Sequence, residues 1–168
     1  MNPAPKSSRL SFLLLTVSLP LFLLDQATKV LTRLHIVEPI EIIPGFFQLV
    51  FVSNTGAAFG LGKNNNLFFV GLSIVALIAI ILLGRNGAFR NKWQRWGLVL
   101  LLPGLAGNLL DRLLHGYVVD FLDFQAGRGG PHWPAFNVAD TCICLAVACF
   151  LWGILSEAKN PAPARPPG

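Results

Sequence analysis

Residues 105–140 read L-A-G-N-L-L-D-R-L-L-H-G-Y-V-V-D-F-L-D-F-Q-A-G-R-G-G-P-H-W-P-A-F-N-V-A-D. Half of the chain's eight acidic residues fall in this stretch, namely Asp111, Asp120, Asp123 and Asp140. Long apolar runs flank it on both sides, over residues 96–110 and 141–155. Carboxylates at membrane depth or at a membrane edge are costly, so by default they mark a functional site. The stretch therefore predicts a site built from acids at the ends of two membrane helices.

The composition of the whole chain indicates a membrane protein. Its 168 residues are one domain's worth of chain, 54% of them are hydrophobic, and only 12% are charged. That charged fraction is about half of the value usual for soluble domains. The net charge of +5 does not form a basic stripe, because the basic residues gather at the ends of the apolar runs. The positive-inside rule explains that distribution, and we expect no nucleic-acid partner.

Four apolar runs predict transmembrane helices over about residues 10–34, 67–83, 96–114 and 136–155. Between the first and the second, residues 35–66 hold short β-branched and aromatic runs that proline, glycine and asparagine interrupt, which predicts a small sheet. A bare sheet edge cannot lie in hydrocarbon, so this sheet should lie outside the bilayer or at its surface. The predicted fold class is an all-α membrane protein of four transmembrane helices with a small extracytoplasmic β-sheet. We expect one integral membrane domain with a disordered, proline-rich tail over about 157–168.

The orientation follows from the positive charges. If both termini are cytoplasmic, eight of the thirteen Lys and Arg residues lie on that side, four of them around the short 84–95 loop. Seven of the eight acids then lie on the other side or near it. Short loops obey the positive-inside rule best. We therefore expect a multi-pass protein whose acidic site faces away from the cytoplasm.

Asp120 and Asp140 are the pair with the clearest chemical potential. Asp120 follows the predicted third helix, Asp140 lies one turn into the fourth, and the roughly 20-residue loop between them can bring both to one membrane edge. Two neighbouring carboxylates share one proton, because they cannot both ionise easily. One can then act as base toward a water while the other polarises a carbonyl, which predicts amide hydrolysis. Helix capping, or pairing with Arg112 and Arg128, is the structural alternative.

The sequence lacks the residue motifs that other hydrolytic mechanisms require. The three histidines are scattered, and neither H-E-x-x-H nor G-x-S-x-G occurs. The three cysteines, Cys142, Cys144 and Cys149, lie in one apolar run and read as small buried hydrophobes. We expect no metal and no cofactor.

Five further polar residues at membrane depth are predicted to pair or to form hydrogen bonds inside the bundle. Asp25 and Lys29 are four residues apart with the acid first, so they can pair on one helix face. Asn108, Asp111 and Arg112 share the outer end of the third helix.

Asn137 is predicted to cap the fourth helix. It lies three residues before Asp140, which is the spacing of an N-cap residue with an acid at N3. The positive end of a helix favours a carboxylate. Asp140 should therefore be the more readily ionised member of the pair, with Asp120 holding the shared proton more of the time.

Five motifs occur in order along the chain: L-D-Q-A-T-K (24–29), N-T-G-A-A-F-G (54–60), G-N-L-L-D-R (107–112), V-V-D-F (118–121) and F-N-V-A-D (136–140). Together they resemble the bacterial lipoprotein signal peptidases (signal peptidase II), a family of aspartic membrane peptidases. The resemblance implies that Asp120 and Asp140 are the catalytic residues. It implies that the site is lined by Asn54, Asn108, Arg112 and Asn137. It also implies supporting roles for Asp25, Lys29 and Asp111.

The resemblance implies an architecture and a substrate as well. Family members have four membrane helices and a small extracytoplasmic sheet that cradles the substrate. The substrate is a prolipoprotein whose cysteine carries a diacylglyceryl group, and the enzyme cuts just before that cysteine. The implied location is the bacterial cytoplasmic (inner) membrane, with the active site at its extracytoplasmic face. The expected partners are this substrate and membrane lipids, and we expect the protein to act as a monomer.

Two other classes of function are weighed against this reading. A small transporter would commonly show paired repeats and interrupted helices at corresponding positions, and the sequence shows neither. A non-catalytic membrane scaffold would place Asp120 and Asp140 in structural ion pairs. Arg112 is the nearest fixed base, and one arginine cannot neutralise all four acids of the 105–140 stretch.

Overall fold

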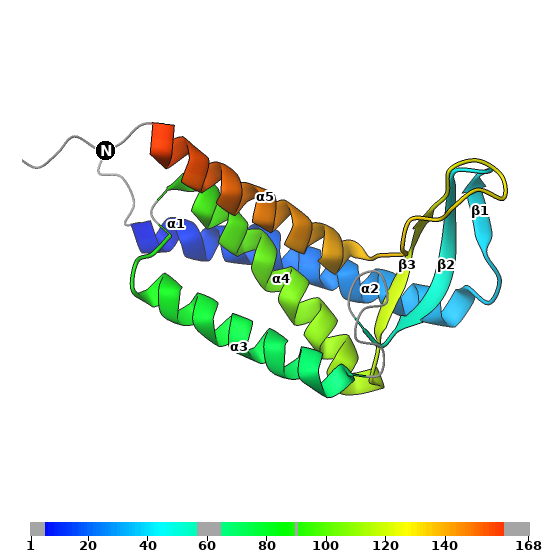
Figure 1. Ribbon diagram of the computed structural model, residues 1–168. Helices are drawn as coiled ribbons and strands as arrows, with labels where there is room; N and C mark the ends of the chain where they lie inside the picture. Colours follow the sequence, from blue (N-terminus) through cyan, green and yellow to red (C-terminus); the bar gives the residue numbers. More distant parts are fainter. Residues whose placement is uncertain (1–5, 57–64, 90, 160–168) are drawn as a thin grey trace, which may run out of the picture.

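Helices make up most of the protein, whose computed structural model describes residues 6–56, 65–89 and 91–159. The first span is continuous: α1 (Lys6–Leu13) passes through a π-helical turn (Leu14–Ser18) into α2 (Leu19–His35). The others are α3 (Asn66–Arg85), α4 (Lys92–His115) and α5 (Val138–Lys159). All four are long and apolar enough to cross a membrane, which confirms the four predicted spans. They lie alongside one another, with the sheet at one end (Figure 1).

The sheet has three antiparallel strands in the order β1-β2-β3: β1 (Ile40–Ile43), β2 (Phe47–Asn54) and β3 (Val118–Phe124). Two strands come from the region predicted to form it, and residues 57–64 of that region lie outside the described residues. The third strand comes instead from the stretch that was expected to be a loop between helices. Nearly every residue of β3 is buried, so it lacks the in-out alternation that reveals a half-exposed strand. β3 also contacts α2 and α4, so it joins the sheet to the bundle.

The helix ends depart slightly from the prediction. α5 begins at Val138, two residues later than expected, because Asn137 caps it. It also continues to Lys159, so residues 157–159 of the predicted tail are helical. The rest of that tail, residues 160–168, lies outside the described residues.

Glycines let α4 approach its neighbours closely. A Cβ on Gly104 would lie 2.7 Å from the carbonyl oxygen of Ala139 in α5. A Cβ on Gly107 would lie 2.4 Å from Oδ2 of Asp25 in α2. Both distances are shorter than a Cβ contact allows, so any other residue at these positions would force α4 or its neighbours to shift.

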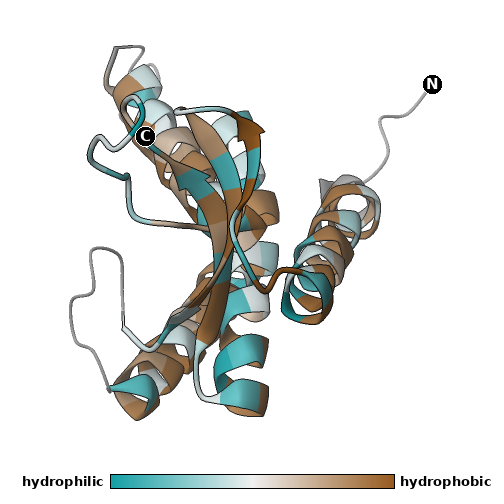
Figure 2. Cartoon of the chain, turned by 90° about the vertical axis from the view of Figure 1, so that its right-hand side faces the viewer, coloured by the Kyte–Doolittle hydropathy of each residue, from teal (hydrophilic) through white to brown (hydrophobic). Residues whose placement is uncertain are grey.

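Large apolar side chains face outward along the helices. Leu67 at the start of α3 is 83% exposed and Leu34 near the end of α2 is 67% exposed. Figure 2, viewed from the sheet end, shows hydrophobic residues on the outer faces of the helices as well as between them. Exposed apolar surface of this extent is unfavourable in water and favourable in lipid.

Candidate active site

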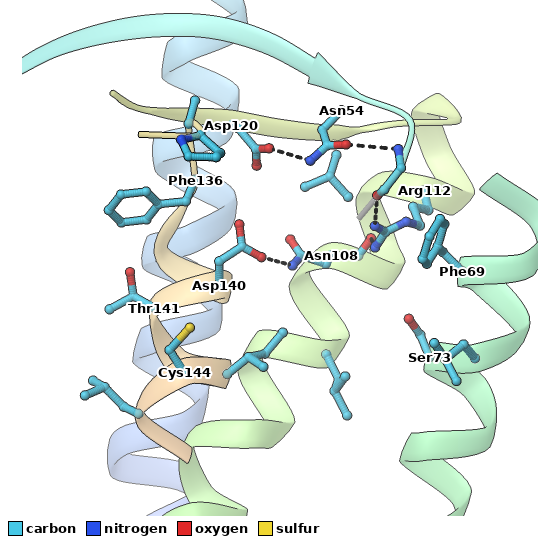
Figure 3. Close-up of a pocket in the computed structure, with 18 of the residues that line it drawn as sticks. Asn54, Phe69, Ser73, Asn108, Arg112, Asp120, Phe136, Asp140, Thr141 and Cys144 are labelled. Carbon is cyan, nitrogen blue, oxygen red and sulfur yellow. Dashed lines mark hydrogen bonds between the residues drawn. The ribbon is translucent and has the colours of Figure 1, made fainter. Parts of the chain in front are cut away.

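A pocket of about 710 Å³ lies where α3, α4 and α5 meet the sheet. Asp120 on β3 and Asp140 in the first turn of α5 both line it, and their carboxyl groups face the same space (Figure 3). Asn54, Asn108 and Arg112 are the other lining residues that the sequence singles out. The structure therefore brings the two acids to one place, although one belongs to the sheet and the other to a helix.

Asp140 is held by a helix cap and by one amide. Its backbone N–H donates to Oδ1 of Asn137 at 2.8 Å, and its Oδ2 accepts from the backbone N–H of Asn137 at 3.3 Å. This reciprocal pair is the capping box that the spacing predicts. The remaining oxygen, Oδ1, accepts from Nδ2 of Asn108 at 2.7 Å.

Asp120 is held by two amides. Its side chain is almost fully buried, Oδ1 accepts from Nδ2 of Asn137 at 2.7 Å, and Oδ2 accepts from Nδ2 of Asn54 at 2.8 Å. Burial, and then the negative charge of Asp140, raise the pKa of Asp120 to about 7, although the two amides oppose the shift. Asp120 is therefore less isolated than the sequence suggests, because two donors stabilise its ionised form.

Neither candidate acid forms an ion pair with a basic residue in the described part of the chain. The alternative that they pair with Arg112 or Arg128 is therefore not observed there. Neutral amides hold both carboxylates, so a proton can be placed on either one without breaking a salt bridge.

A buried charge cluster lies behind the pocket. The Lys29 ammonium, 2% exposed, lies 2.9 Å from Oδ2 of Asp25 and 3.1 Å from Oδ2 of Asp111. The predicted pair of Asp25 and Lys29 is thus confirmed, with Asp111 as a third member. Lys29 also donates to Oδ1 of Asn108 at 2.9 Å.

The two acids of this cluster hold the backbone next to the two candidate catalytic acids. Oδ1 of Asp25 accepts from the backbone N–H of Ala139 at 2.8 Å, directly before Asp140. Oδ2 of Asp111 accepts from the backbone N–H of Val119 at 3.0 Å, directly before Asp120. Lys29 thus fixes two carboxylates, each of which fixes the backbone of one half of the site.

The orientation of the Asn108 amide is set by its neighbours. Its oxygen accepts from Lys29 and, at 3.3 Å, from Nδ2 of Asn137. Both donors lie on the oxygen side, so the NH₂ group must face Asp140. The charge cluster therefore determines which group of Asn108 the carboxylate of Asp140 contacts.

Arg112 connects the pocket to the segment that follows β2. Its Nη2 donates to the carbonyl oxygen of Gly56 at 3.0 Å, and its guanidinium lies over the ring of Phe69, 5.2 Å from the centroid. Asn54 accepts from the backbone N–H of Gly56 at 2.9 Å. Within the described residues, the buried Nε of Arg112 has no hydrogen-bond partner.

All nine residues that the sequence singles out belong to one connected set. Five line the pocket, and the other four, Asp25, Lys29, Asp111 and Asn137, are buried behind it. Reasoning from the sequence missed Phe69 and Ser73 on α3 and the wall at residues 133–136. It also treated Cys144 as buried, whereas this residue is exposed and lines the pocket. Its position four residues after Asp140, on the same helix face, was the available signal.

No metal site is apparent in the described residues, where no three His, Cys, Asp or Glu side chains are grouped to hold an ion. The described residues that line the pocket include a thiol, two hydroxyls and two carboxylates, and the carboxylates are Asp120 and Asp140. The arrangement can place a water and a carbonyl between these two acids.

The chain is similar to known proteins in both sequence and overall structure. The model of the family described as "Signal peptidase (SPase) II" matches residues 17–156. The lipoprotein signal peptidase of Maridesulfovibrio salexigens is 45% identical over 89% of this chain and 97% of its own length. That of Janthinobacterium sp. (strain Marseille) is 41% identical over 82% of this chain and 85% of its own. A bacterial membrane enzyme solved by the in meso method is 29% identical, with a TM-score of 0.79 over 92% of this chain and 94% of its own.

Proposed function

This chain belongs to the signal peptidase II family, and we propose that Asp120 and Asp140 carry out its cleavage of lipoprotein signal peptides. The observation that carries the assignment is that two carboxylates line the same pocket and that the side chains holding them are neutral amides. The transporter and scaffold alternatives account for neither the family membership nor this arrangement.

In the proposed reaction the two acids use one proton between them. The ionised carboxylate takes a proton from a water as the water oxygen attacks the carbonyl carbon of the scissile amide. The protonated carboxyl donates its proton to the carbonyl oxygen, which gives a neutral tetrahedral intermediate. The acid that took the proton of the water then gives it to the amide nitrogen, while the other acid takes a proton from a hydroxyl of the intermediate as the C–N bond breaks. The products are a carboxylic acid and an amine, and each acid is again in its starting protonation state.

Asp140 is the proposed base and Asp120 the proposed acid. Asp140 accepts from a backbone N–H at the start of α5, where the helix dipole favours negative charge. Asp120 accepts from side-chain amides and from no backbone N–H of α5, and with its pKa raised to about 7 it is about half protonated at neutral pH and mostly protonated below it. The two groups are coupled, so this assignment is a bias between two protonation states.

The proposed substrate is a diacylglyceryl-modified prolipoprotein, cut just before the lipidated cysteine. The lining of the pocket combines polar groups, namely the two acids and Arg112, with apolar side chains that include Leu72, Leu105 and Ile143. Such a combination suits a substrate with a peptide bond beside hydrocarbon. Arg112, whose side chain lines the pocket, would hold a backbone carbonyl of the substrate. Every one of these groups comes from one chain, so we infer that a monomer is the working unit.

The site is proposed to lie at the extracytoplasmic face of the bacterial inner membrane. The sheet and the basic 84–95 loop lie at opposite ends of the helices (Figure 1). With the basic loop in the cytoplasm, the sheet and both acids lie on the other side. The test uses single cysteines at two exposed helix ends, Asn65→Cys and Asn86→Cys, with the native cysteines changed to alanine. An impermeant thiol reagent should label the first in intact cells and not the second, and the reverse pattern would invert the orientation.

The test of the dyad is cleavage of a diacylglyceryl-modified prolipoprotein by purified protein. Asp120→Asn and Asp140→Asn should each lower kcat by several orders of magnitude, on the order of 10⁴-fold, because each removes one member of a unit. Glu41→Gln, on β1 of the same sheet as Asp120, and Glu157→Gln, on α5 like Asp140, are matched controls that also replace a carboxylate by an amide, outside the pocket. A variant that folds and keeps a tenth of the activity would remove its residue from the mechanism.

A further inference from the structure

A second acid on β3 has its own partners outside the pocket. Asp123, 6% exposed, accepts from Nε2 of Gln48 at 2.6 Å, directly across from it on β2. Nδ1 of His132 lies 2.8 Å from Oδ2 and 3.0 Å from Oδ1 of the same carboxylate. An ionised carboxylate offers only acceptors, so Nδ1 of His132 carries the proton in this contact. The proposed reaction uses none of these three side chains.

The segment that begins after His132 forms a wall of the pocket. Residues 133–136 all line it, and four backbone hydrogen bonds hold them to β3, two of them accepted by the carbonyl oxygen of Phe136 from the N–H groups of Phe121 at 3.0 Å and Leu122 at 2.9 Å. The N–H of Trp133 donates to the carbonyl oxygen of Phe124 at 2.7 Å, and that of Phe136 donates to the carbonyl oxygen of Leu122 at 3.1 Å. At its far end the segment meets Asn137, the cap of α5. The wall is thus held to β3 through its own backbone, most firmly at Phe136, and it is flanked by the His132 side chain at one end and the Asn137 cap at the other.

The rest of this connection offers little stiffness of its own. Three of its residues are glycine, and Gly127 and Gly129 have positive φ angles of 83° and 72°. Glycine has the largest conformational freedom of any residue in an opened loop, so a glycine-rich turn needs an external anchor to stay in one conformation. Two backbone hydrogen bonds close the turn itself, from the N–H of Ala126 to Pro131 and from that of Gly130 to Gly127, both at 3.0 Å. On the side nearer to the pocket wall, the external anchors are the contact between His132 and Asp123 and the backbone hydrogen bond from Trp133 to Phe124.

We propose that His132 and Asp123 are positioning residues that hold the wall formed by residues 133–136 against β3, and so set how tightly the lipoprotein precursor binds. This inference rests on the proposed function of the pocket. When the contact is absent, the wall is in its binding-competent position for a smaller fraction of the time, and the apparent affinity falls by that fraction. The carboxyl of Asp120 is held independently, by Asn54 and Asn137, so the chemical step is left unchanged.

A series of substitutions at His132 tests this inference. His132→Ala should raise KM about five-fold with kcat unchanged, which is the size expected when a half-exposed ion pair is lost. His132→Asn should restore a KM near that of the wild type, because its amide nitrogen lies at the same distance from the backbone as Nδ1. His132→Gln places its donor one carbon farther out and should give an intermediate KM. A fall in kcat at constant KM would overturn the proposal. So would the same KM in the Ala, Asn and Gln variants, because KM would then not depend on the position of the donor.

Two further measurements test the pairing of His132 with Asp123 and the anchoring role of His132 separately. In an Asp123→Asn background, His132→Ala should raise KM by less than it does alone, because the two changes remove one contact. Equal effects in both backgrounds would overturn the pairing. Hydrogen exchange of peptides that cover residues 133–136 should be faster in His132→Ala than in wild type and His132→Asn, and unchanged exchange would refute the anchoring role. Hydrogen exchange needs no substrate. If the wild type fails to cleave prolipoprotein, the proposed function is refuted, and the exchange measurement still tests whether His132 anchors residues 133–136.

Discussion

Changing Gly107 to alanine adds a single methyl group and should disturb the active site through Asp25. The new Cβ would lie 2.4 Å from Oδ2 and 3.2 Å from Cγ of Asp25, and 3.4 Å from Cβ of Ala139. Asp25 has no free direction in which to move. Its Oδ1 accepts from the backbone N–H of Ala139 at 2.8 Å, and its Oδ2 lies 2.9 Å from the Lys29 ammonium. Either α4 must move away or Asp25 must release a partner.

The cost can be built from three contributions. Overpacking of a well-filled interior costs about 1–3 kcal/mol. Loss of one hydrogen bond to a buried charged group costs about 1.5–3 kcal/mol more. The higher helix propensity of alanine offsets about 1 kcal/mol of this loss in stability. We therefore expect Gly107→Ala to lower the free energy of unfolding by about 2–5 kcal/mol. Because Asp25 holds the residue before Asp140, we also expect kcat to fall.

The matched control is Gly71→Ala on α3. A Cβ at Gly71 meets no atom within 4 Å, so this variant should be as stable as the wild type or slightly more stable. The assay is thermal unfolding of both variants in the same detergent, with cleavage of a diacylglyceryl-modified prolipoprotein measured in parallel. If Gly107→Ala matches Gly71→Ala in both stability and kcat, then Asp25 does not hold the active site in the way its contacts indicate.

The other predictions concern pH. Since the pKa of Asp120 is raised to about 7, kcat should fall as pH rises through about 7 and the dyad loses its shared proton; a profile that stays flat to pH 9 would refute the assignment. Asn54→Ala removes a donor that stabilises ionised Asp120, so it should move this alkaline limb to higher pH, and an unmoved limb in a folded variant would count against that hydrogen bond. Asn137→Ala should move the limb in the same direction and also destabilise α5 by about 1 kcal/mol, as shown by thermal unfolding. Of the two variants, only Asn137→Ala should lower the melting temperature through the loss of a helix cap.

The features that the sequence predicted well are local ones. The four spans follow from runs of apolar residues, the pair of Asp25 and Lys29 from a spacing of four, and the cap of α5 from a spacing of three. Such signals lie within one helical turn and do not depend on the rest of the fold. The motifs then identified, by resemblance, a set of polar residues that the structure places around one pocket.

The features that escaped prediction depend on contacts between distant segments. β3 is paired with β2 across more than 60 positions, as between Asn54 and Val118, and the burial of most of its residues removes the alternation that would have revealed it. Phe69 and Ser73 enter the site only because α3 packs beside α4, and neither belongs to a polar motif. The contact between Asp123 and His132 likewise arises only after the connection folds back on the strand.

The charge cluster around Lys29 has a consequence for how the protein is made. The chain is synthesised from its N-terminus, so α2 reaches the membrane well before α4 leaves the ribosome. Lys29 finds Asp25 within the same helix, and this span can therefore partition into lipid as a neutral pair. Asp111 arrives 82 residues after Lys29 and meets an ammonium already in place. We therefore expect the first span to assist insertion of the third, and the carboxylates proposed to be catalytic to take their places last.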